Sequence, residues 1–180
     1  MNTAMNETLL CFIPKCPQAS MIKNYRPICL CNTVYKTMTK IIVNRIKFYL
    51  PYIIGPNQAS FLSNRKALDN ASIVQEYITH FGKMEGKSSN MILKIDLEKA
   101  FDRLEWSFIK QTPHAFKFPN TITNLIMSCV SSSTISVIVN GEKTNPFMST
   151  RGIKQGDPLS LYLFILCMEK LSKDIGRNVL

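Results

Sequence analysis

The most regular alternation of apolar and polar residues lies between residues 91 and 97, which read MILKIDL. Met91 and every second residue after it are apolar, and Lys94 and Asp96 occupy two of the positions between them. A repeat of two residues is typical of a β-strand, because successive side chains point to opposite faces of the sheet. The pattern therefore predicts a strand over residues 91–97 with one carboxylate, Asp96, near its C-terminal end.

Two explanations fit a carboxylate at this place. Mg²⁺ prefers carboxylate oxygens, and sites that transfer phosphoryl groups use one or two acids together with substrate phosphates to hold the ion. Asp is also a frequent turn residue, because its side chain accepts hydrogen bonds from the nearby backbone. The segment by itself leaves both explanations of Asp96 open.

A turn and a helix should follow this strand. Asp102 and Glu105 have the spacing of a capping box, in which both side chains bind backbone N–H groups at the start of a helix. The helix should end near residue 111, since Pro113 has no amide proton and its ring clashes with the preceding turn, at a cost of about 3 kcal/mol. Phe101 would then lie at the corner between strand and helix, beside the carboxylate of the strand.

Further strands are indicated elsewhere in the chain. Residues 9–14 form a short apolar run, and a second strand is expected to begin at Arg26, because a residue that precedes proline is restricted to extended backbone. Residues 134–139 are mostly β-branched and lead into an Asn-Gly pair. This pair is a strong signal for a tight hairpin, with a returning strand over residues 142–148.

Helices are predicted in three other places. Asn32 or Thr33 is suited to cap a helix that ends near residue 50, where a proline follows. A second helix should cover residues 66–81 and close at Gly82. A third should cover residues 120–131, whose apolar residues fall on one side.

Residues 151–160, which read RGIKQGDPLS, predict the start of the last helix. Asp157 is suited to the N-cap and Pro158 to the first helical position, and the helix should continue to about residue 175, where a glycine follows. The free N–H groups at its start, with Lys154 and Gln155 just upstream, suit a phosphate or a nucleotide. Helix capping alone explains the same residues, so the segment leaves the choice open.

The charge is unevenly distributed along the chain. The net charge is +10, with 22 Lys and Arg against 12 Asp and Glu, and residues 8–68 contain no acidic residue. A basic segment with clear apolar periodicity is expected to fold and to present a basic surface, for which nucleic acid is the favoured ligand. A solvated helix face is the alternative. Lys36 and Lys40 lie in this segment and are candidate nucleic-acid contacts.

The remaining composition argues against several classes of protein. The 6 cysteines and 2 histidines form no CxxC pair or other zinc pattern, so we expect reduced thiols in an intracellular protein. The amino terminus lacks the basic and apolar regions of a secretory signal. Residues 159–168 are apolar but shorter than the ~20 residues that span a bilayer, so no membrane association is expected. Nuclear or cytoplasmic residence stays open.

Five segments together resemble one known family. They are, in chain order, FIPK (residues 12–15), NYRPICLCN (24–32), NQASF (57–61), KIDLEKAFDRLEW (94–106) and RGIKQGDPLSLYLF (151–164). In this order and spacing they resemble the reverse transcriptase domain of non-LTR (LINE-type) retrotransposons. The resemblance covers residues 7–174, and five segments in register are far more specific than any one alone.

This resemblance implies an α+β fold that is part of a right-hand polymerase, with basic fingers in residues 1–90 and an incomplete palm in residues 91–180. It implies RNA-directed DNA synthesis, in which the 3′-hydroxyl of a DNA primer attacks the α-phosphate of a deoxynucleoside triphosphate opposite an RNA template. Two Mg²⁺ ions would stabilise the attacking and leaving oxygens. No obligate protein partner is evident.

The resemblance also implies roles for individual residues. Asp96 matches the first metal-binding aspartate of the family, which makes it the candidate catalytic residue, and the backbone carbonyl of Leu97 would be a further metal ligand. Phe101 matches the aromatic gate that excludes a 2′-hydroxyl and so selects deoxynucleotides. The other matches are nucleotide-binding positions and one basic position near the template, namely Arg26, Gln155 and Gly156 for the nucleotide and Arg65 for the template.

The chain departs from the family in ways that affect activity. The family takes further metal ligands from a hairpin with a Tyr/Phe-x-Asp-Asp sequence, and this chain has no Asp-Asp pair. Leu161 replaces the proline that is usual after QGDPLS, and Pro113 interrupts a helix that the family keeps. We therefore expect a chain truncated before that hairpin, inactive by itself, and prone to associate through the uncovered edge of the 91–97 strand.

Three hypotheses follow. The chain is a reverse transcriptase domain that is active only within a longer product, a nucleic-acid-binding remnant without catalysis, or a relic of a mobile element with no selected role. Primer extension with Mg²⁺ distinguishes the first from the second. Strong, salt-dependent binding of nucleic acid distinguishes the second from the third.

Overall fold

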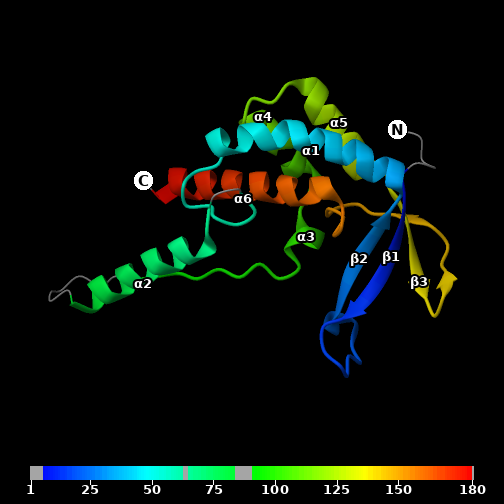
Figure 1. The fold of residues 1–180 in the computed structure, drawn as a ribbon, viewed down its shortest axis with the longest axis horizontal. Coiled ribbons are helices and arrows are strands. Elements are labelled where there is room, and N and C mark those ends of the chain that lie inside the picture. Colours follow the sequence, from blue (N-terminus) through cyan, green and yellow to red (C-terminus); the bar gives the residue numbers. More distant parts are fainter. Residues whose placement is uncertain (1–5, 63–64, 84–90, 180) are drawn as a thin grey trace.

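The computed structural model describes residues 6–62, 65–83 and 91–179 of the 180-residue chain. Figure 1 shows a group of packed helices, a sheet at one end of it, and one helix that projects away from both. The helices of the group are α1 (Thr33–Ile53), α4 (Trp106–Ala115), α5 (Asn120–Ser131) and α6 (Pro158–Val179). The projecting helix is α2 (Ala67–Lys83), which an extended segment joins to the short α3 (Ala100–Arg103).

The sheet combines strands from distant parts of the sequence. Its strands are β1 (Glu7–Pro14), β2 (Tyr25–Cys31), β3 (Thr134–Val139), β4 (Glu142–Lys143) and β5 (Phe147–Met148), and a 3-10 helix, η2 (Ile22–Asn24), precedes β2. β1 pairs antiparallel with β2, with Leu10 opposite Cys29, and parallel with β3, with Leu10 opposite Val137. Strands from both sides of residue 90 therefore share one sheet.

The hairpin predicted after β3 is confirmed. Asn140 and Gly141 have φ angles of 50° and 86°, the left-handed backbone that a two-residue hairpin turn needs. The returning chain forms two short strands, β4 and β5, rather than one, and both pair antiparallel with β3. Between them, Thr144 Oγ1 accepts the Val137 N–H at 3.0 Å. This side-chain acceptor replaces a backbone carbonyl and interrupts the ladder.

The core lies between α1, α6, α4 and α5. Leu50 of α1, Ile109 of α4, Ile126 of α5 and Leu166 of α6 are all fully buried. Each such side chain contributes about 1.5–3 kcal/mol relative to an exposed position, so this cluster is a main source of stability. The buried residues of α1 recur every three or four positions, at Tyr35, Thr39, Ile42, Val43, Ile46 and Leu50.

The helix α1 begins as predicted but ends later. Asn32 caps it, because its Oδ1 accepts a hydrogen bond from the Val34 N–H at 2.8 Å. The prediction that Pro51 stops the helix is wrong, since α1 continues to Ile53. Proline removes one backbone hydrogen bond, but the Ile54 N–H still donates to the Leu50 carbonyl at 2.9 Å and closes the last turn.

The predicted end of α4 is also wrong, because the helix passes through Pro113 to Ala115. Pro113 is buried. Beyond it, the Phe116 N–H donates to the carbonyls of Thr112 at 3.3 Å and Pro113 at 3.1 Å. Burial of the proline ring and the hydrogen bonds of the final turn offset the loss of the backbone hydrogen bond that proline cannot donate.

The capping box predicted from Asp102 and Glu105 is not formed. Asp102 lies in α3, which ends before α4 begins. Neither Lys99 at the start of α3 nor Glu105 at the start of α4 makes a side-chain cap hydrogen bond. Leu104 is buried between the two helices, and its extended backbone separates them.

Two glycines predicted to end helices lie inside them instead. Gly82 belongs to α2, which continues to Lys83, and Gly176 belongs to α6, which continues to Val179. A glycine inside a helix costs about 1 kcal/mol relative to alanine, which is small for a helix of several turns. The predicted range of α5 and the predicted start of α6 at Pro158 are confirmed.

The prediction of a strand over residues 91–97 is wrong. The segment is an irregular connection from α2 to α3, and all its side chains are exposed, Met91 to 85% and Leu93 to 72%. A strand needs a neighbour that satisfies its N–H and C=O groups, and no strand of the described sheet pairs with this segment. The alternation is present in the sequence, whereas a pairing partner is absent from the described residues.

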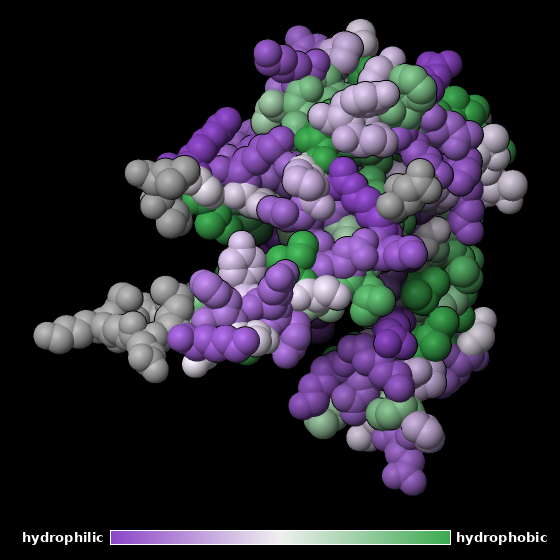
Figure 2. Space-filling model, turned by 60° about the vertical axis from the view of Figure 1, so that its left-hand side comes forward, coloured by the Kyte–Doolittle hydropathy of each residue, from purple (hydrophilic) through white to green (hydrophobic). Residues whose placement is uncertain are grey.

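The helix α2 is equally uncovered. None of its residues is buried, and its apolar residues Val74, Tyr77 and Ile78 are about half exposed. Figure 2 shows the α2 arm standing apart from the body of the molecule. The expectation that uncovered apolar surface promotes association thus extends from residues 91–97 to α2, and it stays a prediction.

Candidate functional site

A hollow of about 590 Å³ opens where β1, β2, α3 and the loop before α6 meet; we call it the central pocket. Arg26 from β2, Phe101 from α3 and Gln155 from the loop line it. Cations outnumber acids among its lining residues, with Lys15, Arg26, Lys99, Arg151 and Lys154 against Asp102 and Asp157. A concave surface with an excess of positive charge favours an anionic ligand.

Hydrogen bonds join the loop before α6 to α3 and its flanking residues. The Gly152 N–H donates to the Leu104 carbonyl at 2.7 Å, and the Ile153 N–H donates to the Phe101 carbonyl at 2.9 Å. The indole N–H of Trp106 donates to the Gly152 carbonyl at 2.9 Å. These bonds fix the Phe101 backbone relative to the loop.

The same loop is joined to β2 on its other side. The Cys29 N–H donates to the Gln155 carbonyl at 2.7 Å. The next residue, Gly156, has a φ of 113°, and a Cβ atom there would lie 2.9 Å from the Cys29 carbonyl oxygen. Only glycine accepts both the backbone angle and the close approach. The loop therefore stays against the strand that carries Arg26.

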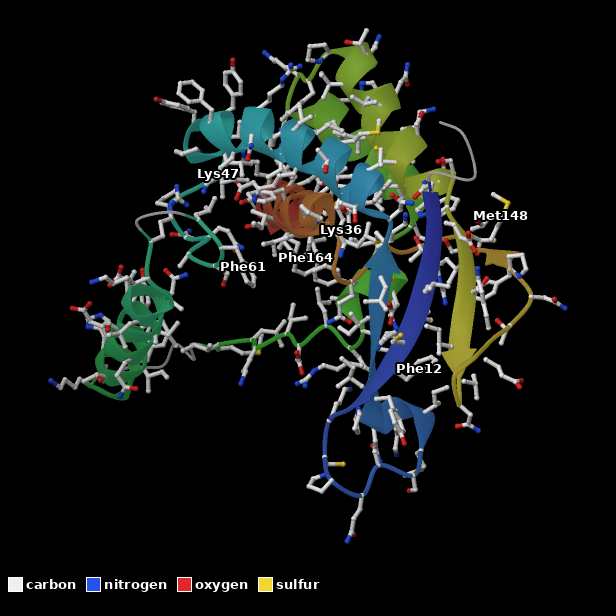
Figure 3. All side chains as sticks on the ribbon, turned by 45° about the vertical axis from the view of Figure 1, so that its right-hand side comes forward. Phe12, Lys36, Lys47, Phe61, Met148 and Phe164 are labelled. Carbon is white, nitrogen blue, oxygen red and sulfur yellow. The ribbon has the colours of Figure 1, made fainter. Side chains whose placement is uncertain are left out.

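The ring of Phe101 has a fixed neighbour. It stacks on the ring of Phe164 from α6, with 4.9 Å between the centroids and 21° between the planes. Phe164 lies on the side of α6 that faces α3 (Figure 3). A stacked aromatic pair contributes about 0.5–1.5 kcal/mol beyond simple burial, so the stack restrains Phe101 at the edge of the central pocket.

A buried polar network forms part of the wall of the pocket, which Tyr35, Lys154 and Asp157 line. Lys154 Nζ donates to Asn6 Oδ1 and lies 3.9 Å from the centroid of the Tyr35 ring. The Tyr35 hydroxyl donates to Asp157 Oδ2 at 3.2 Å, and the Asp157 Oδ1 accepts the Leu159 N–H at 3.4 Å. Asp157 thus caps α6 as predicted. Lys154, expected upstream as a phosphate contact, is only 8% exposed and serves the network.

Burial shifts the pKa of several groups in this region. Burial raises the pKa of the Asp157 carboxyl, against the opposing effect of its hydrogen bonds and of Lys154. Burial likewise lowers the pKa of Lys154 and raises that of Tyr35. The pKa of the Cys29 thiol is raised to about 11, mainly by burial and then by the nearby Cys31. Cys29 is therefore a protonated structural thiol and not a nucleophile at neutral pH.

The residues expected to contact nucleic acid lie outside the central pocket. Lys36, labelled in Figure 3, is half-buried on α1, and Lys40 is exposed one turn further on. The Arg65 guanidinium donates to the carbonyls of Ile54 at 3.1 Å, Gly55 at 2.5 Å and Gln58 at 2.8 Å. Arg65 thus binds the end of α1 and the loop after it, and its role toward a template stays a prediction.

Asp96 and Leu97 lie in the exposed connection before α3, and neither lines the central pocket. A carboxylate and a main-chain carbonyl are hard oxygen donors of the kind that Mg²⁺ takes. The described residues contain no group of three or more His, Cys, Asp or Glu that could hold a metal ion. The donors are therefore of the right chemical type, but the described residues do not complete a metal site.

The fold and the pocket define a class of protein. A solved structure with a similar fold is apo telomerase from Candida tropicalis, truncated from its C-terminal domain, with a TM-score of 0.60. The match covers 98% of this chain and 40% of that chain at 16% sequence identity. The chain thus has the fold of a right-hand polymerase, and the expected α+β fold class is confirmed.

The particular family follows from sequence similarity. Residues 13–179 match the family Reverse transcriptase (RNA-dependent DNA polymerase). The chain is 33% identical over 161 residues to the Transposon TX1 uncharacterized 149 kDa protein of Xenopus laevis. It is 30% identical over 168 residues to the Retrovirus-related Pol polyprotein from type-2 retrotransposable element R2DM of Drosophila melanogaster. The chain belongs to the reverse transcriptase family and is a reverse transcriptase domain of the non-LTR retrotransposon type.

The chain is short beside these relatives. The matches cover 89% and 93% of this chain but 12% and 16% of the Xenopus and Drosophila proteins. Reverse transcriptase domains generally use divalent metal ions and bind nucleic-acid templates and nucleotides. Within the described ranges, no helix has the length and apolarity needed to cross a membrane.

The close approach at Gly156 yields a first testable prediction. Gly156→Ala should lower the free energy of unfolding by about 1–3 kcal/mol, because the new Cβ would meet the Cys29 carbonyl in strained backbone. Gly176→Ala is the matched control, since nothing lies within 4 Å of its Cβ position and alanine favours the helix. Urea denaturation of both variants measures the difference. Equal stability of the two variants would contradict the assignment.

The buried Asp157 predicts a pH dependence of stability. Its raised pKa means that the folded protein binds this proton more readily than the unfolded chain. The free energy of unfolding should therefore fall as the pH rises from the ordinary value of 3.8 through the raised pKa. Asp157→Asn should remove this part of the slope in urea denaturation measured at a series of pH values from 3.8 upward. Asp69→Asn, on the exposed α2, is the control, and an unchanged slope in Asp157→Asn would refute the prediction.

Proposed function

We propose that this chain provides the nucleotide pocket of an RNA-directed DNA polymerase and that a deoxynucleoside triphosphate binds in the central pocket. The proposal rests on the observation that three distant segments of the chain meet at one pocket. Arg26, Phe101 and Gln155 come from three segments far apart in sequence, each matched to a nucleotide-binding position of the family, and all three line one basic hollow. RNA template and DNA primer are the proposed partners, with residues 1–90 as fingers and residues 91–180 as a partial palm.

The triphosphate would interact with the cationic side of the pocket. Arg26 is exposed on β2, so its guanidinium is free to form paired hydrogen bonds with phosphate oxygens. Gln155 lines the pocket and offers an amide to the nucleotide. Gly156 does not line it, and its Cβ position faces the Cys29 carbonyl, so its proposed contribution is to hold this loop against β2. Binding would rely on a preformed surface, because the loop is bonded to both α3 and β2.

The sugar would meet Phe101. Its ring is restrained by the stack on Phe164, so it cannot turn aside without losing that contact. A 2′-hydroxyl directed at the ring would lose hydration without gaining a hydrogen-bond partner. Discrimination against ribonucleotides would follow from this combination of bulk and missing polar groups.

The catalytic role proposed for Asp96 depends on Mg²⁺. The Asp96 carboxylate and the Leu97 carbonyl would contribute ligands to one of two ions, and the remaining ligands would come from beyond the described residues. When bound, Mg²⁺ supplies positive charge next to the phosphate oxygens that change during nucleotidyl transfer. Along the polynucleotide, Lys36 and Lys40 would neutralise phosphates, and Arg65 would shape the loop near the template.

A non-catalytic nucleic-acid-binding role is the second candidate. It is favoured by the incomplete ligand set, because the described residues include no group of three potential metal-binding side chains. Extension of a DNA primer on an RNA template with Mg²⁺ separates the candidates. Extension by the 180-residue chain would exclude the non-catalytic role.

The gate assignment predicts a change in sugar selection. Affinities of the full chain for dGTP and GTP can be compared by titration with fluorescent analogues. Phe101→Val should narrow the preference for the deoxynucleotide by about tenfold, the effect of ~1.4 kcal/mol. Phe12→Val is the matched control, because Phe12 lines the same pocket from β1 but does not stack on Phe164. An unchanged preference in Phe101→Val, or an equal change in both variants, would reject the gate.

The metal assignment predicts a change in Mg²⁺ dependence. Mg²⁺ should increase the affinity of the chain for dGTP, and Asp96→Asn should remove most of that increase, since it removes a charged oxygen donor. Asp69→Asn removes an exposed carboxylate from α2 and should leave the increase intact. Titrations with and without Mg²⁺ measure both variants. The same increase in Asp96→Asn as in the unaltered chain would remove Asp96 from the proposal.

A further inference from the structure

The helix α1 carries an unusual outer surface. Its buried face packs in the core, yet its C-terminal half also exposes large aromatic side chains, with Phe48 68%, Tyr49 57% and Tyr52 82% exposed. These residues are spaced so that they lie on neighbouring positions of one helix face, together with Ile41 and Arg45. A cluster of exposed aromatic side chains on one helix face is typical of an interaction surface, whereas single exposed apolar residues occur on most proteins.

This face forms one wall of a groove of about 1020 Å³, which we call the α1 groove. The opposite wall is formed by Phe116 and Phe118 of the turn between α4 and α5 and by Ile122 of α5. The α1 groove shares no lining residue with the central pocket. It is therefore a second concave site, separate from the proposed nucleotide pocket.

The charge around the groove has a single sign. Both walls come from stretches without Asp or Glu, residues 8–68 and residues 106–141. Arg45 and Lys117 line the groove, and Lys173 Nζ lies 4.8 Å from the centroid of the Phe116 ring. Glu169, which pairs with Lys173 at 3.2 Å, is only 8% exposed.

More cations lie on the same helix, but on another face. At about 100° per residue, Lys36, Lys40 and Lys47 fall on the side of α1 away from Arg45 and Tyr52, and Figure 3 labels Lys36 and Lys47 toward the two ends of the helix. The surface of α1 thus carries cations on two faces and no acidic residue. An occupant with negative charge repeated along its length would complement this arrangement.

We propose that the α1 groove binds single-stranded nucleic acid, with unpaired bases stacked on Phe48, Tyr49 and Tyr52 and phosphates near Arg45 and Lys117. Aromatic faces combined with cations and no nearby acid in the walls are what sequence-tolerant strand binding requires, because every base has a flat face and every link carries a charge. An apolar peptide would use the apolar walls but would gain nothing from the cations. The site adds a strand contact outside the nucleotide pocket and does not depend on that pocket.

The test measures binding of fluorescein-labelled 20-nucleotide oligouridine and oligothymidine to the full chain by fluorescence anisotropy. The double variant Phe48→Ala/Tyr52→Ala should bind both strands at least about tenfold more weakly, because loss of a stacked base costs ~1–3 kcal/mol. Tyr77→Ala is the matched control, an aromatic residue 56% exposed on α2. Both positions of the double variant are exposed, and thermal melting verifies that the fold is retained.

The charge component is tested separately by salt dependence. Arg45→Gln should reduce the slope of log affinity against log salt by about 1, whereas Lys83→Gln, at the exposed end of α2, should not. A blunt-ended duplex should compete poorly, since its bases are already stacked. Tighter binding of oligouridine than of oligothymidine would identify RNA as the preferred strand, and equal binding would indicate the chemistry shared by both.

Three results would overturn the proposal. One is unchanged strand affinity in Phe48→Ala/Tyr52→Ala, and another is equal competition by the duplex. A third is loss of self-association in that variant, measured by sedimentation, with no loss of strand binding, which would make the groove a protein contact. Affinity for dGTP should be the same in the double variant as in the unaltered chain, so failure of this groove and failure of the nucleotide pocket are distinguishable.

Discussion

The candidate site depends on one loop whose backbone is bonded on both sides. Toward α3, the Ile153 N–H donates to the Phe101 carbonyl, and toward β2, the Cys29 N–H donates to the Gln155 carbonyl. Main-chain bonds of 2.9 and 2.7 Å require close approach, which glycine allows at the two crowded positions of the loop. A strand, a helical turn and the start of α6 therefore keep fixed relative positions although they are distant in sequence.

Because of this constraint, the residues proposed to bind the nucleotide and the residue proposed to bind the metal ion lie in different surroundings. The parts that would recognise a nucleotide are rigid, because the loop is bonded to its neighbours and the charges of Lys154 and Asp157 are accommodated in a buried network with Tyr35. The proposed metal-binding acid, Asp96, instead lies in an exposed connection without a pairing partner among the described strands. A reverse transcriptase needs both, since preorganised groups lower a barrier only when they surround the reacting atoms.

Local signals were sufficient for most of the fold. The cap at Asn32, the Asn-Gly hairpin and the Asp-Pro start of α6 depend on residues close in sequence, and each is present. One error occurs where a distant contact decides, since residues 91–97 alternate like a strand but have no described neighbour. The others are local, because prolines and glycines expected to end helices lie inside them. In the site, the motifs identified Arg26, Phe101 and Gln155, which line the pocket, whereas Gly156, Asp96 and Leu97 do not line it. Asn6 and Tyr35 were missed, because Asn6 meets its lysine partner 148 positions away and no local pattern marks either residue.

The parallel pairing of β1 with β3 also limits when the sheet can form during synthesis of the protein. Glu7 lies opposite Thr134 in this ladder, so β1 can pair with β3 only after the roughly 125 residues between them have been translated. Pairing across such a separation is slow, because a long loop must close before the contacts form. Until then the edge of β1 that pairs with β3 is unprotected, and an unpaired strand edge favours association of partly folded chains.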